Sequence, residues 1–248
     1  MRPALESLSQ LKAGVRQAYG RLILDLRALP EPAFREPSLL PRWTRAHVAT
    51  HIARNADSHL RLLEAAAVGR STEQYVGGRE GRNAEIEVGA RRNAREFVAD
   101  VERSSLALFE VWERTPENVW GQTLNAMIGE RPAWHLVWGR WRELEIHHVD
   151  LICGYLPTSW PHDFVDTLFD QVILGLPARL TNDLSLTLSV GDGSQRHIGL
   201  DRPENLTIEG AKADVLAWML GRVLEKSSVR CLTPEGEHAH LPRLAPWG

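Results

Sequence analysis

The segment Arg140–Leu151 holds the residues best suited to chemistry, because Glu143 and His147 lie four positions apart within it. On a helix this spacing places both side chains on one face, about 6 Å apart along the axis, close enough to share one metal ion. The same spacing is also common in a weak pair on a solvent-exposed helix. The pair therefore forms at most half of a metal site, and another helix must supply the remaining ligands.

A polar stripe earlier in the chain offers such ligands. Its side chains recur at intervals of four on what is otherwise an amphipathic helix: His47, His51, Asn55 and His59. Buried imidazole and carboxylate groups cost free energy unless a partner satisfies them. Two helices with polar residues at core-facing spacing therefore favour a metal site between them. We expect His47 and His59 to be half-exposed helix residues rather than ligands.

The neighbours of the Glu143–His147 pair are predicted to have other roles. Glu145 lies about 200° around the helix from Glu143 and is expected to be solvated. His148 lies about 100° from His147 and is expected either to pack or to make a supporting hydrogen bond.

The composition favours a site made of imidazole and carboxylate. The 248-residue chain has ten histidines but two cysteines, Cys153 and Cys231, which excludes a multi-thiolate cluster and indicates a reducing, cytoplasmic compartment. Its formal net charge of −3 gives no electrostatic footprint for nucleic acid. The first residues form no apolar signal region, and no uncharged run approaches the roughly 20 residues that span a bilayer. We therefore expect no nucleic-acid or membrane partner.

Two kinds of pattern divide the chain. Apolar spacings of three and four predict four long helices in residues 1–154, over 5–29, 44–68, 83–114 and 132–152. Residues 155–161 are the predicted linker. In residues 162–248 an alternating run at 183–190 predicts a strand, and further strands are expected at 196–200, 205–208 and 229–233, with helices at 162–176 and 211–225. The fold class is therefore α+β and mainly α, a four-helix bundle followed by a small α/β domain.

Several motifs together carry a family resemblance. They are the segment Trp43–Asp57, Tyr75-Val-Gly-Gly with Arg82 and Glu85-Ile86 after it, Arg142–Leu151, and Gly221-Arg222. Across nearly the whole chain the sequence resembles the mycothiol-dependent maleylpyruvate isomerase family. The resemblance implies an N-terminal DinB-like four-helix bundle that binds a metal, joined to a smaller C-terminal α/β domain.

The resemblance also implies a set of functional residues. A divalent metal, zinc in the family's usual assignment, would be held by His51, Glu143 and His147, and such a set leaves a coordination position open for catalysis. The catalytic arginine of the C-terminal domain would be Arg222, although a surface arginine at a helix end fits this position too.

Three residues of a glycine-rich loop are weaker candidates. Tyr75, Arg79 and Arg82 could bind the substrate or the thiol at the mouth of the site, or could belong to plain surface.

The implied reaction is a cis-to-trans isomerisation through reversible addition of a thiolate to the double bond. Cys153 is about 240° around its predicted helix from His147, and Cys231 falls in a predicted strand as a small hydrophobe, so neither is expected to attack. The thiol cosubstrate implied by the resemblance is mycothiol, and the substrate is a small molecule. Two alternatives stay open, which are a mycothiol S-transferase or thiol-exchange enzyme of specialised metabolism, and a non-catalytic ligand-binding protein.

Overall fold

The computed structural model describes residues 5–180, 184–191, 193–199 and 206–247, which divide into two units, residues 1–154 and 155–248. Three terminal residues of the predicted strands lie outside the described residues: Asp183, Leu200 and Asn205. The first unit is mainly helical and the second contains a mixed β-sheet, so the predicted α+β class is confirmed.

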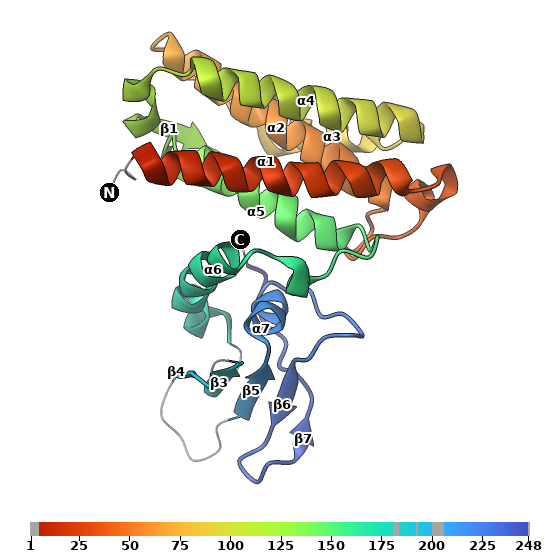
Figure 1. Ribbon diagram of the computed structural model, residues 1–248, viewed down its shortest axis with the longest axis vertical. Helices are drawn as coiled ribbons and strands as arrows, with labels where there is room; N and C mark the ends of the chain where they lie inside the picture. Colours follow the sequence, from red (N-terminus) through yellow and green to blue (C-terminus); the bar gives the residue numbers. More distant parts are fainter. Residues whose placement is uncertain (1–4, 181–183, 192, 200–205, 248) are drawn as a thin grey trace. The chain divides into compact units, whose positions relative to one another are not determined.

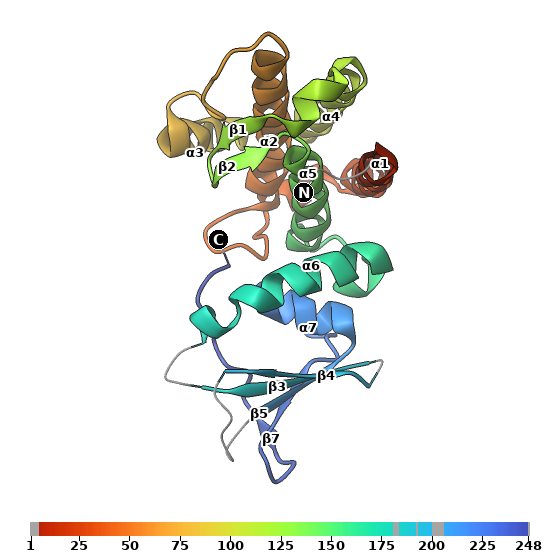
Figure 2. The same ribbon diagram turned by 90° about the vertical axis from the view of Figure 1, so that its left-hand side faces the viewer.

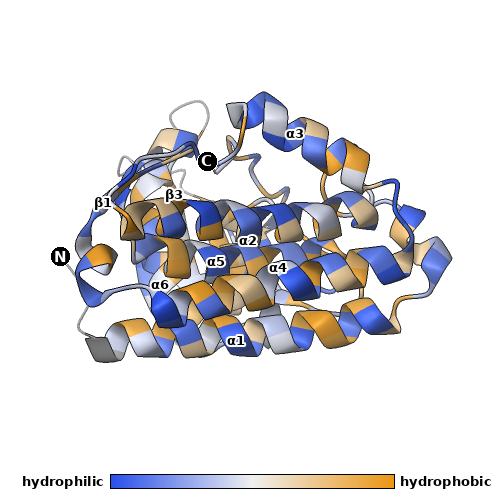
Figure 3. Ribbon diagram, turned by 90° about the horizontal axis from the view of Figure 1, so that it is seen from above, coloured by the Kyte–Doolittle hydropathy of each residue, from blue (hydrophilic) through white to orange (hydrophobic). Residues whose placement is uncertain are grey.

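Four long helices build the first unit (Figure 1): α1 (Leu5–Ala28), α2 (Arg45–Ala67), α4 (Ala94–Arg114) and α5 (His135–Asp150). Helix α1 contacts α4 and α5, and α2 also contacts both of them, so the four close around one core. Hydrophilic and hydrophobic residues alternate along these helices, as expected for amphipathic segments (Figure 3). No helix within the described ranges is both long and apolar enough to cross a membrane.

The start of α2 explains one histidine of the polar stripe. Thr44 is the N-cap, and its backbone N–H donates to Nδ1 of His47 at 3.2 Å in a capping box. The side chain of His47 is 17% exposed and is used to satisfy the helix terminus.

The predicted third helix is wrong as a single element. The chain forms α3 (Gly78–Gly89) and α4, with a break between them. Asn93 caps α4 by accepting a hydrogen bond from the Glu96 backbone at 3.1 Å, while the Glu96 carboxylate accepts from the Asn93 backbone at 2.8 Å. This capping box begins a new helix where the apolar periodicity alone predicted continuation.

The predicted fourth helix begins too early and ends too late. Residues before α5 form an antiparallel hairpin of β1 (Thr123–Ala126) and β2 (Gly129–Pro132), so Pro132 ends a strand instead of starting a helix. At the other end α5 stops at Asp150, and Ile152 has a left-handed φ of 49°. The hairpin has too few residues to show a clear alternating pattern in the sequence.

The second unit contains a five-stranded sheet with the order β4-β3-β5-β6-β7. The strands are β3 (Leu186–Val190), β4 (Gln195–Ile198), β5 (Leu206–Gly210), β6 (Arg230–Leu232) and β7 (His238–Ala239). The β3–β5 pair is parallel and the other pairs are antiparallel. Helices α6 (His162–Gly175) and α7 (Lys212–Met219) lie on one side of this sheet (Figure 2).

Short 3₁₀ helices complete the described elements, at Glu31–Arg35, Glu117–Gly121, Pro157–Ser159 and Pro177–Arg179. The predicted helix 211–225 is too long, because α7 ends at Met219. Gly221 has a φ of 80°, and the backbone N–H groups of Gly221 and Arg222 donate to the carbonyls of Trp218 and Ala217. This is a Schellman motif, which ends a helix at a left-handed glycine.

Two glycines of α1 provide a test of the α1–α5 packing. A Cβ at Gly14 would lie 2.6 Å from the Trp141 ring on α5, whereas a Cβ at Gly20 meets nothing within 4 Å. We predict that Gly14→Ala lowers the free energy of unfolding by about 1–3 kcal/mol through overpacking. Gly20→Ala, the matched control, should raise it by about 0.5–1 kcal/mol through lower chain entropy. Urea denaturation followed by circular dichroism measures both, and equal stability of the two variants would contradict this packing.

Candidate metal centre

Three side chains from two helices bring their donor atoms together. His51 Nε2 of α2 lies 2.8 Å from Glu143 Oε2 and 3.0 Å from His147 Nε2, and the last two atoms are 3.3 Å apart. Tetrahedral zinc with nitrogen and oxygen ligands requires separations of about 3.3–3.6 Å, so small movements would make this donor set fit a divalent metal. His51 is buried, whereas Glu143 and His147 keep side-chain exposures of 29% and 14%, so a small ligand can reach them.

The three donor groups differ in protonation because their surroundings differ. Burial lowers the pKa of His51 to about 4, against the opposing charge of Glu143, so this imidazole is neutral. Burial also acts to lower the pKa of His147, but hydrogen bonds to Asp150 and Glu143 outweigh it and raise this pKa to about 9. For Glu143, burial is outweighed by His51 and His147, and the pKa is held well below its usual range. A cation binding here must therefore replace one proton on His147.

Asp150 orients His147 from behind. Its carboxylate, fully buried, lies 2.7 Å from His147 Nδ1 and accepts that hydrogen, which leaves Nε2 facing the other two donors. A carboxylate behind a ligating imidazole is a common supporting partner in metal sites. Asp150 is not among the site residues predicted from the sequence. Its position three residues after His147 places both side chains on one helix face, which is the pattern that could have indicated this contact.

Arg82 contacts the opposite nitrogen of His51. Its Nη2 lies 3.0 Å from His51 Nδ1, and its guanidinium lies 5.9 Å from the ring centroids of both Trp43 and Tyr75. Because a guanidinium only donates hydrogen bonds, Nδ1 accepts here and Nε2 carries the ring hydrogen. A metal at Nε2 would move that hydrogen to Nδ1, so metal binding and this Arg82 contact exclude each other.

The other loop candidates differ in their positions. Tyr75 is buried, 6% exposed, and burial followed by the charge of Glu143 raises its pKa. Arg79 is exposed in the first turn of α3, and among the described residues it makes no hydrogen bond or ion pair. The structure thus brings Tyr75 and Arg82 close to the candidate metal centre and leaves Arg79 apart from it.

A buried arginine accounts for the rest of the polar stripe. Arg140 is fully buried and donates to Ile52 O at 2.7 Å, to Asn55 Oδ1 at 2.9 Å and to Ser105 Oγ at 3.0 Å. His59 is 4% exposed, so the prediction that it is half-exposed is wrong. Burial, then the charge of Arg140, lowers the pKa of His59 to about 3 and keeps it neutral.

The predicted exposure of Glu145 is also wrong. Helix α1 covers that face of α5, and Glu145 is fully buried, where it accepts from Trp141 Nε1 at 3.0 Å and Arg21 at 2.6 Å. His148 is 1% exposed, and its Nε2 lies 2.8 Å from Asp25 Oδ2 of α1. His148 was predicted either to pack or to make a supporting hydrogen bond. It makes a hydrogen bond, but to Asp25 rather than toward His51, Glu143 and His147.

The remaining candidates belong to other elements of the chain. Arg222 follows α7 in the second unit, is half-buried, and donates to Leu220 O at 2.6 Å. Cys231 is 1% exposed on β6, as predicted for a small hydrophobe, and burial raises its pKa. Cys153 lies beyond the end of α5 instead of on it, and it groups with Asp25 and His148 rather than with His147.

Comparison with known proteins identifies the class to which this bundle and its donor set belong. The family model described as the mycothiol maleylpyruvate isomerase N-terminal domain matches residues 15–152, more than half of the chain and the part that carries all three donors. The chain belongs to this family, which confirms the resemblance predicted from the sequence.

Two solved structures are similar to the whole chain. One is a crystal structure of the mycothiol-dependent maleylpyruvate isomerase, at 26% identity and a TM-score of 0.84, and the alignment covers 97% of each chain. The other is a mutant of that enzyme in which alanine replaces a histidine, at 25% identity, a TM-score of 0.83 and the same coverage. A search of curated proteins gave no match.

The first test of the site is its metal content. We predict that His51→Ala and His147→Ala each lower the bound zinc by about one equivalent per chain, because two remaining donors hold the ion weakly. His162→Ala, an exposed histidine at the start of α6, is the matched control and should leave the content unchanged. Elemental analysis after gel filtration measures the metal, and unchanged zinc in both site variants would refute the assignment.

The second test is the pH dependence of zinc affinity. Below the pKa of about 9, His147 is protonated in the metal-free protein and must release that proton to bind zinc. The logarithm of the affinity should therefore rise by about one per pH unit up to pH ~9 and then level off. Asp150→Asn removes an interaction that raises this pKa, so the plateau should begin at lower pH. Chelator competition measures the affinity, and a flat profile between pH 7 and 9 would count against protonated His147.

Proposed function

We propose that this protein is a metal- and mycothiol-dependent cis–trans isomerase that acts on maleylpyruvate or a similar cis-enoyl acid. The observation that carries the proposal is the convergence of His51, Glu143 and His147 in a chain of this family. The 26% identity to a solved mycothiol-dependent maleylpyruvate isomerase over 97% of both chains supports it. A zinc ion bound to these donors would supply one thing, a deprotonated thiol at neutral pH.

The reaction needs a nucleophile that adds and then leaves. The thiolate forms a carbon–sulfur bond to one alkene carbon, and the π electrons move toward the conjugated carbonyl. Rotation about the resulting single bond precedes elimination, which breaks the carbon–sulfur bond and restores the thiolate and a trans alkene. No oxidant or reductant is consumed. Neither Cys153 nor Cys231 belongs to the donor group, so an external thiol is the nucleophile in this proposal.

Residues of the chain would bind and orient the reactants. Trp43 and Tyr75 flank Arg82 beside His51. Once Arg82 is released from His51, its guanidinium is available for a substrate carboxylate. We assign Arg222 to a second carboxylate and to the negative charge that develops during addition.

The activity test combines the purified protein, zinc, mycothiol and maleylpyruvate. We predict loss of the cis substrate with formation of the trans isomer, and no consumption of mycothiol. Arg222→Ala should lower kcat/KM by about 10²–10³-fold without changing the metal content, because a charge-stabilising donor is lost. Arg230→Ala, an exposed arginine on β6, is the matched control.

Other outcomes separate the alternatives. Stable adduct formation with an electrophile, without isomerisation, would indicate a mycothiol S-transferase that uses the same metal and thiol. Isomerisation without added thiol would contradict the proposed nucleophile. Metal binding without turnover of any electrophile would favour a non-catalytic ligand-binding protein.

A further inference from the structure

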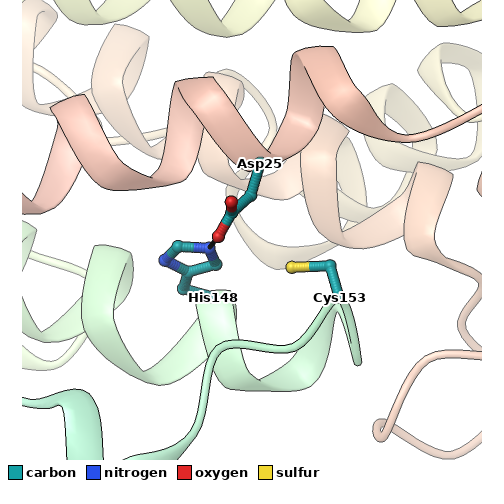
Figure 4. Close-up of side chains that lie close together, drawn as sticks. All are labelled: Asp25, His148 and Cys153. Atoms are coloured by element: carbon teal, nitrogen blue, oxygen red, sulfur yellow. Dashed lines mark hydrogen bonds and ion pairs between the residues drawn. The ribbon is translucent and has the colours of Figure 1, made fainter.

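A second group of side chains that could bind a metal lies where α5 meets α1. Asp25, His148 and Cys153 each present one ligand atom, and these atoms all lie within 4.8 Å of one another. Figure 4 shows the Asp25 carboxylate and the Cys153 sulfur converging on the His148 ring. Within the described residues this group shares no member with His51, Glu143 and His147.

Three different elements hold these side chains in place. Asp25 is in the last turns of α1, His148 is near the end of α5, and Cys153 is in the turn that follows. That turn has left-handed φ angles at Ile152, 49°, and Gly154, 98°. A β-branched residue rarely adopts this conformation. The turn ends the helical path and places Cys153 beside α1 rather than on the next turn of α5.

The consecutive histidines separate the two groups. His147 and His148 differ by about 100° around the helix axis, so His147 meets α2 while His148 meets α1. Neither group therefore competes with the other for a ligand.

The donor types favour zinc. One imidazole nitrogen, one carboxylate oxygen and one thiolate sulfur are all zinc ligands, and a soft sulfur disfavours magnesium or calcium. Zinc with these ligands requires donor separations of about 3.3–3.8 Å, and these atoms lie within 4.8 Å of one another, so short shifts of the side chains would close the group. The Asp25 side chain is 41% exposed, and Cys153 is half-buried, which gives an ion a route of entry.

The local charge is compatible with a cation. Arg21 lies one turn before Asp25 and its charge acts on His148, but its guanidinium also pairs with the buried Glu145 carboxylate at 2.6 Å, which offsets that charge. The carboxylate of Asp25 and a thiolate at Cys153 would together balance the two charges of zinc.

We propose that Asp25, His148 and Cys153 form a second zinc site, distinct from the candidate catalytic metal centre. The bound ion joins α1 to the turn that ends α5, with a fourth position left for water. It also converts Cys153 to a coordinated thiolate and withdraws it from reaction with electrophiles.

Cobalt distinguishes the two sites because only the second contains sulfur. After loading with Co²⁺, the wild-type protein should bind about two equivalents and show a thiolate-to-cobalt charge-transfer band in the near ultraviolet. Cys153→Ala should bind about one equivalent and lose the band. Cys231→Ala, the matched cysteine control, should keep both the metal and the band. The double variant His51→Ala/His147→Ala should lose one equivalent and retain the band.

A measurement on the wild-type protein is independent of any effect of substitution on folding. Zinc should slow alkylation of Cys153 by iodoacetamide by about 10-fold or more, with peptide mapping separating it from Cys231. The proposal is overturned if cobalt gives no charge-transfer band, if the band persists in Cys153→Ala, or if zinc leaves the alkylation rate unchanged. Loss of the isomerase activity proposed above would not affect these readouts.

Discussion

The packing of α5 between α1 and α2 is the constraint on which the rest of the first unit depends. Polar side chains extend from this helix in several directions, and four of them are buried: Arg140, Glu145, His148 and Asp150. Such groups cost free energy unless each has a partner. Helix α1 satisfies Glu145 and His148, while α2 supplies carbonyl and amide oxygens for Arg140 and brings His51 to Glu143 and His147. The requirement for partners therefore links the stability of the bundle to the geometry of the candidate metal centre.

The charges in this interior explain why the centre suits a cation. Glu143 remains ionised although it is partly buried, because His51 and His147 stabilise its charge. His147 is held protonated by two carboxylates, Glu143 and Asp150. The proton on His147 thus supplies the positive charge that balances these carboxylates. A divalent ion can replace that proton without creating an unpaired buried charge.

The break between α3 and α4 matters for the centre as well. A single helix over residues 83–114 would carry its first turns away along the axis of α4. Because Asn93 caps the start of a separate helix, α3 can pack against α2. Helix α2 therefore contacts both α3 and α4. This arrangement places Arg82 against His51 and between Trp43 and Tyr75. A local capping signal therefore determines how the mouth of the site is formed.

The sequence by itself determined the mainly helical first unit, the strand-containing second unit, the family, and the spacing of Glu143 and His147 on one helix face. Those features follow from periodicity and from residue types, which act locally. The tertiary structure alone decided that Glu145 and His59 are buried, that β1 and β2 precede α5, and that Cys153 turns back toward Asp25 and His148. Helical spacing shows which residues share a face, but it contains no information about which neighbour covers that face. Burial and donor convergence arise from contacts between segments more than ninety residues apart, such as His51 and Glu143.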